Sequence, residues 1–217
     1  GFFLHSGADI RRVRTDGDIF ESERLINCAG LYADRVAHGL GGGEDYVIFP
    51  FRGDYFCLRE AKWDLVRSMI YPAPNLKYPF LGIHFTKKVT GEVLAGPNAV
   101  LAMGRESYRP FDINVRETWD MIRSAKFWKM IGGPEFRSLA VEQIKTSFFK
   151  RAFLNRARRL LPMLAPEDVV RGQSGNRAQL VNAKGDLVED LVVECSGRSV
   201  HVLNAVSPGL TCSLPFA

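Results

Sequence analysis

The sequence lacks several features that would assign it quickly to a class of proteins. No apolar run approaches the ~20 residues that cross a bilayer, and the first residues lack the basic and then long apolar regions of a signal peptide. The glycine-rich phosphate-binding patterns G-x-G-x-x-G and G-x-x-x-x-G-K-[ST] are absent as well. We therefore expect no transmembrane helix and no phosphate-binding loop. Because the chain opens with Gly1 and strand-like residues rather than Met, we expect its start to be an internal point of a longer protein.

Cysteine is also scarce. The four cysteines lie far apart and form no C-x-x-C pair, which argues against a metal site and against a disulfide framework. They are Cys28, Cys57, Cys195 and Cys212. We expect reduced, buried thiols in a cytoplasmic protein.

The composition supports a folded core. Of the 217 residues 46% are apolar, which is enough for one large or two small domains. The net charge of +5 is modest, and its densest basic stretch, residues 145–159, contains no acidic residue. This stretch is either a solvated helix face or a surface for acidic lipid headgroups. Nucleic acid is not an expected partner, since no RNA- or DNA-binding motif accompanies the charge.

The pattern of apolar residues predicts strands, a helix, more strands, two helices and again strands. The first helix should cover residues 31–38 and stop at the glycines that follow. Asn114 and Glu117 form a capping-box signature before a helix that extends to about residue 131. A second long helix should run over residues 140–161 and stop at Pro162. This order indicates an α+β fold in which an antiparallel sheet is joined to pieces of an α/β layer.

Residues 81–100 are typical of a β-hairpin with a turn at Thr90 and Gly91. In the first strand, Leu81, Ile83 and Phe85 fall on one face. His84 falls on the other face between small residues, Gly82 and Thr86. The hairpin therefore presents an imidazole on a sheet surface that could face a ligand.

A series of short motifs occurs in order along the chain. They are N-C-A-G-x-x-A-D at 27–34, P-F-R-G-D-Y at 50–55, P-F-L-G-I-H-F-T at 79–86, G-P-N-A-V-L-A at 96–102, R-G-x-x-G-x-R-A-Q at 171–179 and H-V-x-N-A-x-S-P at 201–208. This series closely resembles the L-2-hydroxyglutarate dehydrogenase/oxidase family, FAD enzymes of the D-amino-acid-oxidase superfamily. The resemblance covers only the later part of such an enzyme, because the strand, glycine-rich turn and helix that hold the FAD pyrophosphate are absent.

The resemblance implies an antiparallel-sheet substrate domain and part of a Rossmann-like FAD domain. Residues 1–45 would belong to the FAD domain and residues 46–168 to the substrate domain, and residues 169–217 would return to the FAD domain. The implied reaction is oxidation of L-2-hydroxyglutarate to 2-oxoglutarate, with hydride transfer to flavin N5, although the fragment alone should be inactive. The implied partners are a small dicarboxylate and an electron acceptor, either a quinone of the respiratory chain or oxygen. The implied location is cytoplasmic or peripheral to the inner membrane.

Two residues are the main candidates for chemistry on the substrate. His84 is the candidate base, because its near-neutral pKa suits proton transfer and the family's G-x-H-x-T strand faces the flavin. Arg177 is the candidate ligand of a substrate carboxylate, which a guanidinium can bind with two parallel hydrogen bonds. The alternatives are a structural histidine and a surface arginine paired with an acid such as Asp186.

Further candidates surround the substrate and the flavin. Arg52 is a second possible ligand of a substrate carboxylate. Asn98 binds either the substrate or the backbone, and His201 points either to the pocket or to the core. Ala29 and Gly30 lie at a strand end where the backbone could approach the flavin closely. The segment Ser207, Pro208, Gly209, Leu210 and Thr211 reads as a helix start whose free amides favour negative charge near the flavin ring.

Two other functions remain open from the sequence. A sister flavoenzyme acting on an amino acid or on glycerol 3-phosphate would share much of this pattern. Alternatively the piece is a non-catalytic fragment or binding module, as the missing phosphate loop suggests.

Overall fold

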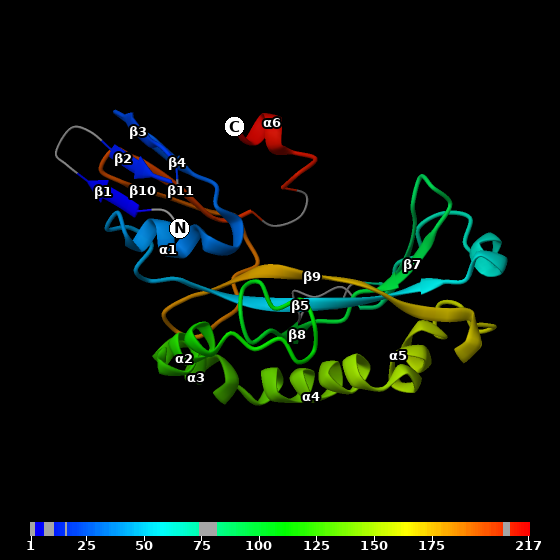
Figure 1. The fold of residues 1–217 in the computed structure, drawn as a ribbon. Coiled ribbons are helices and arrows are strands. Elements are labelled where there is room, and N and C mark those ends of the chain that lie inside the picture. Colours follow the sequence, from blue (N-terminus) through cyan, green and yellow to red (C-terminus); the bar gives the residue numbers. More distant parts are fainter. Residues whose placement is uncertain (1–2, 7–10, 16, 74–81, 206–208) are drawn as a thin grey trace. The chain divides into compact units, whose positions relative to one another are not determined.

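The structure, a computed structural model, describes the chain except residues 1–2, 7–10, 16, 74–81 and 206–208. The chain forms two compact units (Figure 1). The terminal unit comprises residues 1–49 and 178–217, and the central unit comprises residues 50–177. The predicted division into FAD and substrate domains at residues 45 and 168 stays a prediction, but the boundaries of the compact units lie at residues 49 and 177 instead.

The terminal unit contains two small sheets and one well-packed helix. Strands β1 (Phe3–Ser6), β2 (Arg11–Arg14) and β3 (Ile19–Ser22) form an antiparallel meander. In the second sheet β11 (Ser199–Asn204) pairs antiparallel with β10 (Val192–Ser196) and parallel with β4 (Leu25–Asn27). A 3-10 turn (Gly30–Tyr32) leads from β4 into α1 (Ala33–His38), and α6 (Ser213–Phe216) is near the C-terminus.

A small core and one buried carboxylate hold the terminal unit together. Ala33 and Ala37 of α1 pack with Ile48, Leu180 and Leu203. Asp34 is buried, and its Oδ2 accepts a hydrogen bond of 2.8 Å from the backbone amide of Ile48. The predicted helix at residues 31–38 is thus confirmed, and its side chains attach the following strand to the unit.

The central unit is an antiparallel sheet with helices on one face (Figure 1). The sheet has the order β6 (His84–Lys87), β7 (Val93–Gly96), β5 (Val47–Leu58) and β8 (Val100–Leu101), and β9 (Val169–Val181) pairs with β5. The helices are α2 (Val115–Arg123), α3 (Ala125–Gly132), α4 (Pro134–Phe148) and α5 (Lys150–Ala157), with 3-10 turns at Glu60–Leu65 and Pro166–Asp168.

The core of the central unit lies between the sheet and the helices. Phe56 of β5 and Phe85 of β6 are buried with Phe153 and Leu154 of α5. The rings of Phe56 and Phe153 are 4.4 Å apart between centroids. Fully burying such side chains contributes roughly 1.5–3 kcal/mol each, so this contact is a main source of the unit's stability.

Both predicted long helices are interrupted in the structure. The first predicted helix is interrupted at Ser124, where α2 ends. The backbone of Ser124 is extended (ψ 122°), and α3 begins directly after it. The second is broken at Phe149, with φ −110° and ψ 105°, between α4 and α5. Neither break contains proline or glycine, so tertiary packing decides it. The break at Phe149 allows α5 to bury Phe153 and Leu154 in the core.

Of the two hydrogen bonds that define the predicted capping box at α2, the structure contains one. The Asn114 side chain accepts a hydrogen bond from the amide of Glu117 at 3.1 Å, as predicted. The Glu117 carboxylate does not return to Asn114 but accepts from the amide of Arg105 at 2.7 Å. The capping residue therefore stabilises α2 while its partner fixes a neighbouring loop.

Two strands, β5 and β9, are long and uninterrupted. The segments around Pro50 join into β5, in which the Pro50 carbonyl accepts a hydrogen bond from Ala102. Likewise residues 169–181 form one strand, β9. Proline cannot donate to a ladder but can accept, so Pro50 is tolerated inside the strand.

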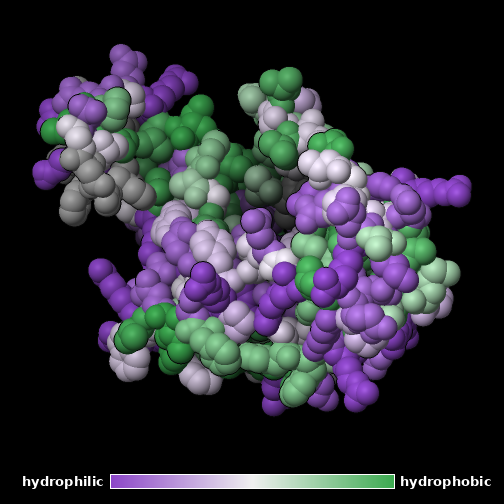
Figure 2. Space-filling model, turned by 45° about the vertical axis from the view of Figure 1, so that its right-hand side comes forward, coloured by the Kyte–Doolittle hydropathy of each residue, from purple (hydrophilic) through white to green (hydrophobic). Residues whose placement is uncertain are grey.

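The outer surface of the helices is partly apolar. Exposed apolar side chains follow α2 to α4, along the lower edge of the view in Figure 2. They include Val115, Trp119, Trp128, Val141, Ile144 and Phe148. No helix among the described residues is long and apolar enough to cross a membrane.

Candidate functional site on the open face of the sheet

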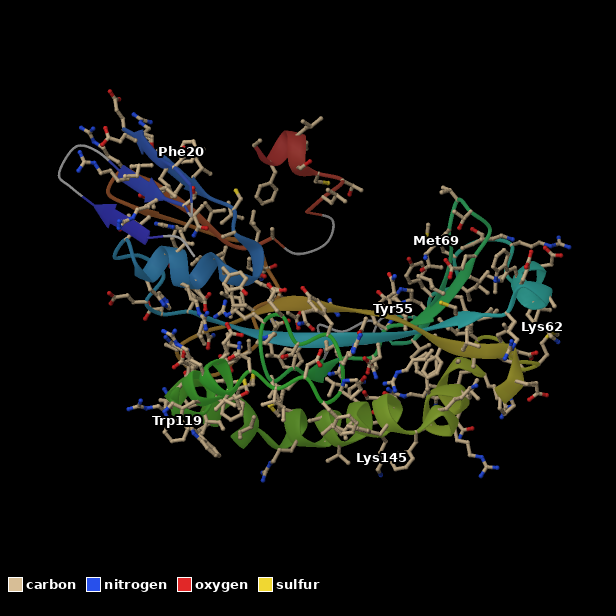
Figure 3. The ribbon with its side chains drawn as sticks, in the orientation of Figure 1. Phe20, Tyr55, Lys62, Met69, Trp119 and Lys145 are labelled. Atoms are coloured by element: carbon tan, nitrogen blue, oxygen red, sulfur yellow. The ribbon has the colours of Figure 1, made fainter. Side chains whose placement is uncertain are left out.

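Side-chain alternation gives the central sheet a covered face and an open face. Ile83, just before β6, and Phe85 of β6 are buried in the helix-side core, whereas His84 and Thr86 are only half-buried. On β5, Phe56 and Leu58 are buried in the same core, and Tyr55 points to the opposite side from α4 (Figure 3). The predicted parity of the hairpin is confirmed for the described residues, and Leu81 lies outside them. The open face is therefore where a ligand can reach the sheet.

His84 is held in a defined orientation at the start of β6. Its Nδ1 donates a hydrogen bond of 3.2 Å to the carbonyl of Gly82, because a carbonyl can only accept. Nε2 therefore carries the free lone pair of the neutral ring. Tyr71 stacks on the imidazole with ring centroids 4.6 Å apart and an interplanar angle of 26°.

The surroundings of His84 favour its neutral form. Burial lowers the pKa of His84, the hydrogen bond to Gly82 raises it, and the positive charge of Arg177 lowers it further. The net shift is downward from the ordinary value near 6.5. At neutral pH the imidazole can accordingly accept a proton, as a general base must.

Arg177 lies close enough to His84 and to Tyr55 to interact with each of them electrostatically, and Tyr55 also interacts with Tyr71. Arg177 is exposed as a whole residue, yet the surrounding protein removes enough water to lower the pKa of the guanidinium, while Tyr55 raises it. The guanidinium stays charged at neutral pH. Burial raises the pKa of Tyr55 above its ordinary value, although Arg177 opposes this shift. Tyr55 therefore keeps its proton and can donate a hydrogen bond.

These four side chains form what we call the open-face cluster: Tyr55, Tyr71, His84 and Arg177. His84 and Arg177 are predicted site residues, and the structure brings them together from strands that are 93 positions apart in the sequence. The two tyrosines were missed. Tyr55 is the last residue of the P-F-R-G-D-Y string, so its position was visible as a motif residue without an assigned role.

Two glycines give the tyrosine its place on the open face. A Cβ on Gly96 would come within 2.9 Å of the Asp54 carbonyl and 3.0 Å of the Tyr55 ring, and Gly96 has φ +138°. A Cβ on Gly172 would lie 2.9 Å from Sγ of Cys57. Only glycine lets the neighbouring strands approach β5 this closely.

Arg52 and Asn98 are not part of the open-face cluster. Arg52 is 3% exposed, and its Nε donates to Asp54 at 2.8 Å while its NH1 donates to the Arg109 carbonyl at 2.8 Å. Asn98 accepts from the Asp54 amide at 2.7 Å and donates to Thr146 at 3.4 Å. Both side chains are engaged within the protein beneath the sheet, so the geometry supports a structural role rather than the predicted contact with substrate.

His201 lies in the core of the terminal unit. It is completely buried, and its Nδ1 is 3.1 Å from Nδ2 of Asn27. Burial lowers the pKa of His201, and Glu194 raises it. Its Nε2 has no hydrogen-bond partner among the described residues. Of the two positions that the sequence left open, the structure places His201 in the core.

The terminal unit has features that fit the edge of a cofactor domain. Strand β4 runs parallel to β11, and Ala29 and Gly30 follow its end, where Gly30 has φ +55°. The Asn27 side chain accepts a hydrogen bond from the Ala29 amide at 3.1 Å, which fixes this turn. Space around Gly30 is open, since an added Cβ would meet nothing within 4 Å. A ring or chain of a bound ligand could therefore approach the turn closely.

The second predicted flavin segment is only partly described. Ser207 and Pro208 lie outside the described residues. Gly209, Leu210 and Thr211 form a turn before α6, and Leu210 is 88% exposed. The described residues contain no group of three His, Cys, Asp or Glu side chains that could hold a metal ion.

The antiparallel central sheet and the parallel β4–β11 pair define a mixed α/β protein of the kind found in flavin-dependent oxidases. Two solved structures have this arrangement. L-α-glycerophosphate oxidase from Mycoplasma pneumoniae aligns with a TM-score of 0.64 and 17% identity, covering 97% of this chain and 46% of that one. Glycine oxidase from Geobacillus kaustophilus aligns with a TM-score of 0.52 and 19% identity, covering 93% and 42%. At these identities the similarity concerns the fold alone.

The family follows from the sequence match. Residues 3–217 match the family described as DAO, FAD dependent oxidoreductase, and the chain belongs to this family. It is 38% identical over 208 residues to the mitochondrial L-2-hydroxyglutarate dehydrogenase of Bos taurus, covering 94% of this chain and 44% of that protein. It is also 38% identical over 205 residues to L-2-hydroxyglutarate dehydrogenase of Salmonella houtenae, covering 94% and 48%. The resemblance predicted from the motifs is thus confirmed, and the chain spans about half the length of these relatives.

Proposed function

We propose that this chain supplies the substrate-binding face, and part of the FAD domain, of an enzyme that oxidises L-2-hydroxyglutarate to 2-oxoglutarate. The observation that supports this most strongly is the open-face cluster, in which a neutral imidazole, a guanidinium and a tyrosine hydroxyl converge on one side of a sheet. Oxidation of a 2-hydroxyacid needs a base for the hydroxyl proton and cationic or hydrogen-bonding groups for the carboxylates.

Each side chain of the cluster has a specific part in this proposal. Arg177 binds one substrate carboxylate through two parallel hydrogen bonds, and the protonated Tyr55 hydroxyl donates a further one. His84 accepts the hydroxyl proton at Nε2, since its Nδ1 is bonded to Gly82. Tyr71 covers one face of the imidazole and keeps the ring in that orientation. Bound FAD would accept the hydride, and Ala29, Gly30 and the 207–211 segment are the residues proposed to lie against it.

Binding of the substrate to the isolated chain tests the proposal. L-2-hydroxyglutarate should bind more tightly than its D-enantiomer, glycine or glycerol 3-phosphate when each is titrated calorimetrically. Arg177→Gln should weaken this binding about 10- to 100-fold, because a charge-assisted hydrogen bond contributes about 1.5–3 kcal/mol. Arg116→Gln on α2 makes the same change of charge at an exposed position and should leave the affinity unchanged.

Two results would contradict the proposed substrate. Tighter binding of glycine or glycerol 3-phosphate would favour a sister flavoenzyme. Equal effects of the Arg177 and Arg116 substitutions would show that the open face does not bind the dicarboxylate.

We also propose that the chain on its own binds FAD weakly and does not turn over. The sequence contains no glycine-rich loop for the pyrophosphate, which carries much of the recognition of a dinucleotide. Purification in the presence of FAD should give a colourless protein. A yellow protein with one flavin per chain would show that the terminal unit is a sufficient cofactor site.

The proposed acceptor of the electrons is a quinone or oxygen, and contact with a membrane surface would favour the quinone. Exposed aromatic side chains on adjacent helices, Trp119 and Trp128, suit a membrane interface. Co-sedimentation with neutral lipid vesicles tests this contact. Trp119→Ser and Trp128→Ser should each reduce the bound fraction, and an undiminished fraction would argue against it.

A further inference from the structure

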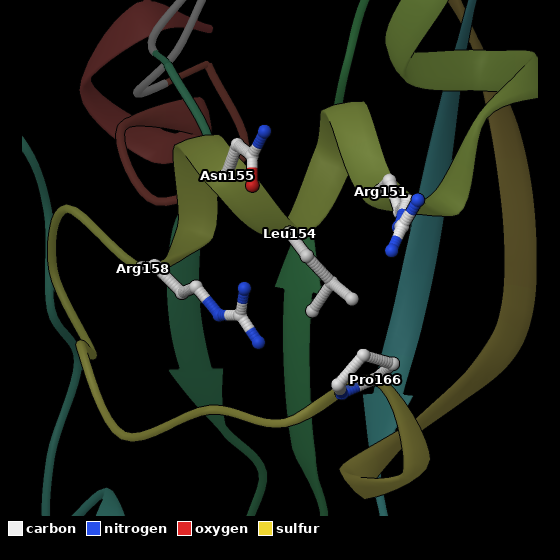
Figure 4. A pocket seen from close by; sticks show the side chains of 5 residues that line it. All are labelled: Arg151, Leu154, Asn155, Arg158 and Pro166. Atoms are coloured by element: carbon white, nitrogen blue, oxygen red, sulfur yellow. The ribbon is translucent and has the colours of Figure 1, made fainter.

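A pocket lies in the central unit beside α5, and it shares no residue with the open-face cluster (Figure 4). Its volume is about 490 Å³. The pocket is lined by Arg151, Leu154, Asn155, Arg158 and Pro166. The polar members are spaced four and three residues apart, so α5 and the residue that follows it present them on one side. Nothing in the proposed oxidation uses this pocket.

The two arginines of this α5 pocket are arranged around an apolar floor. Figure 4 shows the guanidinium groups of Arg151 and Arg158 on either side of Leu154. Arg158 is anchored because its Nε donates to the Leu164 carbonyl at 2.6 Å, which leaves its terminal nitrogens available. For Arg151 the described residues provide no hydrogen bond or ion pair. Both guanidinium groups can therefore donate to a ligand.

The positive charge of the pocket is not neutralised by a lining acid. Asp168 follows Pro166 in the chain, but its carboxylate accepts from the Ala165 amide at 2.8 Å and lies 3.5 Å from Nζ of Lys62. Glu142 lies 2.5 Å from Arg156, which does not line the pocket. The pocket thus combines two cations, one amide and an apolar floor.

We propose that the α5 pocket binds the phosphate group of an organic phosphate. Two planar guanidinium forks match the oxygens of a phosphate dianion, and the Asn155 amide can donate a further hydrogen bond. Pro166, which is exposed beside the buried Leu154, offers apolar surface to the organic part of the ligand. This chemistry is shared by soluble phosphate monoesters and by lipid headgroups of the phosphatidic acid type. Within the basic stretch at residues 145–159 the proposal assigns binding to Arg151 and Arg158, whereas Lys150 donates to the Val169 carbonyl and Arg156 pairs with Glu142.

Phenyl phosphate and vesicles containing phosphatidic acid are the probes that distinguish the two sources. Titration of the 217-residue chain should show saturable binding of at least one of them. Arg151→Gln should weaken this binding about tenfold, the effect of losing roughly 1.4 kcal/mol. Arg159→Gln is the matched control, since Arg159 is exposed, lies on the same segment and does not line the pocket. It should change the affinity less than twofold.

Each outcome decides the proposal. Arg151-dependent binding of phenyl phosphate supports a soluble organic phosphate, and Arg151-dependent binding to the vesicles alone supports a lipid headgroup. Absence of binding to both probes, or equal effects of the Arg151 and Arg159 substitutions, would overturn the site. Urea unfolding of each variant verifies that the fold is intact, and Arg158→Lys provides a variant that keeps the second charge. Excess L-2-hydroxyglutarate should not displace phenyl phosphate, so this test is independent of the proposed enzymatic function.

Discussion

Tyr71 lies against the imidazole of His84 with ring centroids 4.6 Å apart, while Nδ1 of the same imidazole is bonded to Gly82. The imidazole is thereby fixed in its orientation and, when neutral, in its tautomer. The stacking removes water from one face of the imidazole, and the hydrogen bond to Gly82 leaves Nε2 as the proton acceptor. A histidine on a strand thus becomes a candidate base through its neighbours, not through its own chemistry alone.

The protonation of His84 should be visible in solution. Because burial and Arg177 lower its pKa in the folded protein, His84 should titrate below the ordinary value near 6.5 when followed by NMR. Tyr71→Ala should move the pKa of His84 upward by exposing the ring to water. A pKa at or above 6.5 in the parent protein would contradict the burial of the imidazole.

The same shift predicts how stability depends on pH. Between the lower pKa of the folded protein and the higher one of the unfolded chain, the unfolded chain binds more protons, so the free energy of unfolding falls as the pH drops through this window. Above the unfolded pKa the effect is absent. Urea unfolding at pH 7.5 and pH 5 should show a smaller loss for His84→Gln than for the parent. An equal loss would mean that other groups, such as His201, account for the pH dependence.

Arg52 should contribute to the stability of the folded protein and not to substrate binding. Arg52→Leu leaves Asp54 buried with one fewer partner, and breaking a buried ion pair in this way costs about 3–5 kcal/mol. Urea unfolding measures this loss, and Arg116→Gln should stay within about 0.5 kcal/mol of the parent. A weakened affinity for L-2-hydroxyglutarate without loss of stability would restore Arg52 as a substrate ligand.

Tyr55 should contribute its hydroxyl to binding. Tyr55→Phe keeps the ring and removes a hydrogen bond contributing about 0.5–1.5 kcal/mol, so the affinity for L-2-hydroxyglutarate should fall about 2- to 10-fold in calorimetry. Tyr108→Phe, at an exposed tyrosine bonded to Glu106, is the control and should have no effect. If both substitutions leave the affinity unchanged, Tyr55 shapes the face without touching the ligand.

Gly96 should not accept a side chain. In Gly96→Ala the new Cβ would lie 2.9 Å from the Asp54 carbonyl at a backbone φ of +138°, so we expect a loss of at least about 1–3 kcal/mol in the free energy of unfolding. Gly132→Ala provides the contrast, because a Cβ there meets nothing within 4 Å. Equal stability of the two variants would show that the strands can separate at Gly96 without cost.

Several parts of the fold follow from local pattern. The strand at residues 25–27, the helix at 33–38 and the parity of the hairpin depend on alternation and glycine stops within a few residues. The helix breaks at Ser124 and Phe149 do not, since no breaker residue stands there. After Phe149, α5 buries Phe153 and Leu154 against strands that are far away in the sequence, and after Ser124, α3 buries Phe127 and Met130.

The sequence by itself determined the family and pointed to two candidate site residues. Ordered motifs carried the resemblance, and the parity of residues 82–86 separated His84 from the core, because side-chain direction on a strand has a period of two. The tertiary structure decided what surrounds that histidine. It placed Tyr71 and Arg177 beside His84, with Tyr55 next to Arg177, and placed Arg52 in a buried ion pair, because burial and distance between strands depend on how the sheet and helices pack.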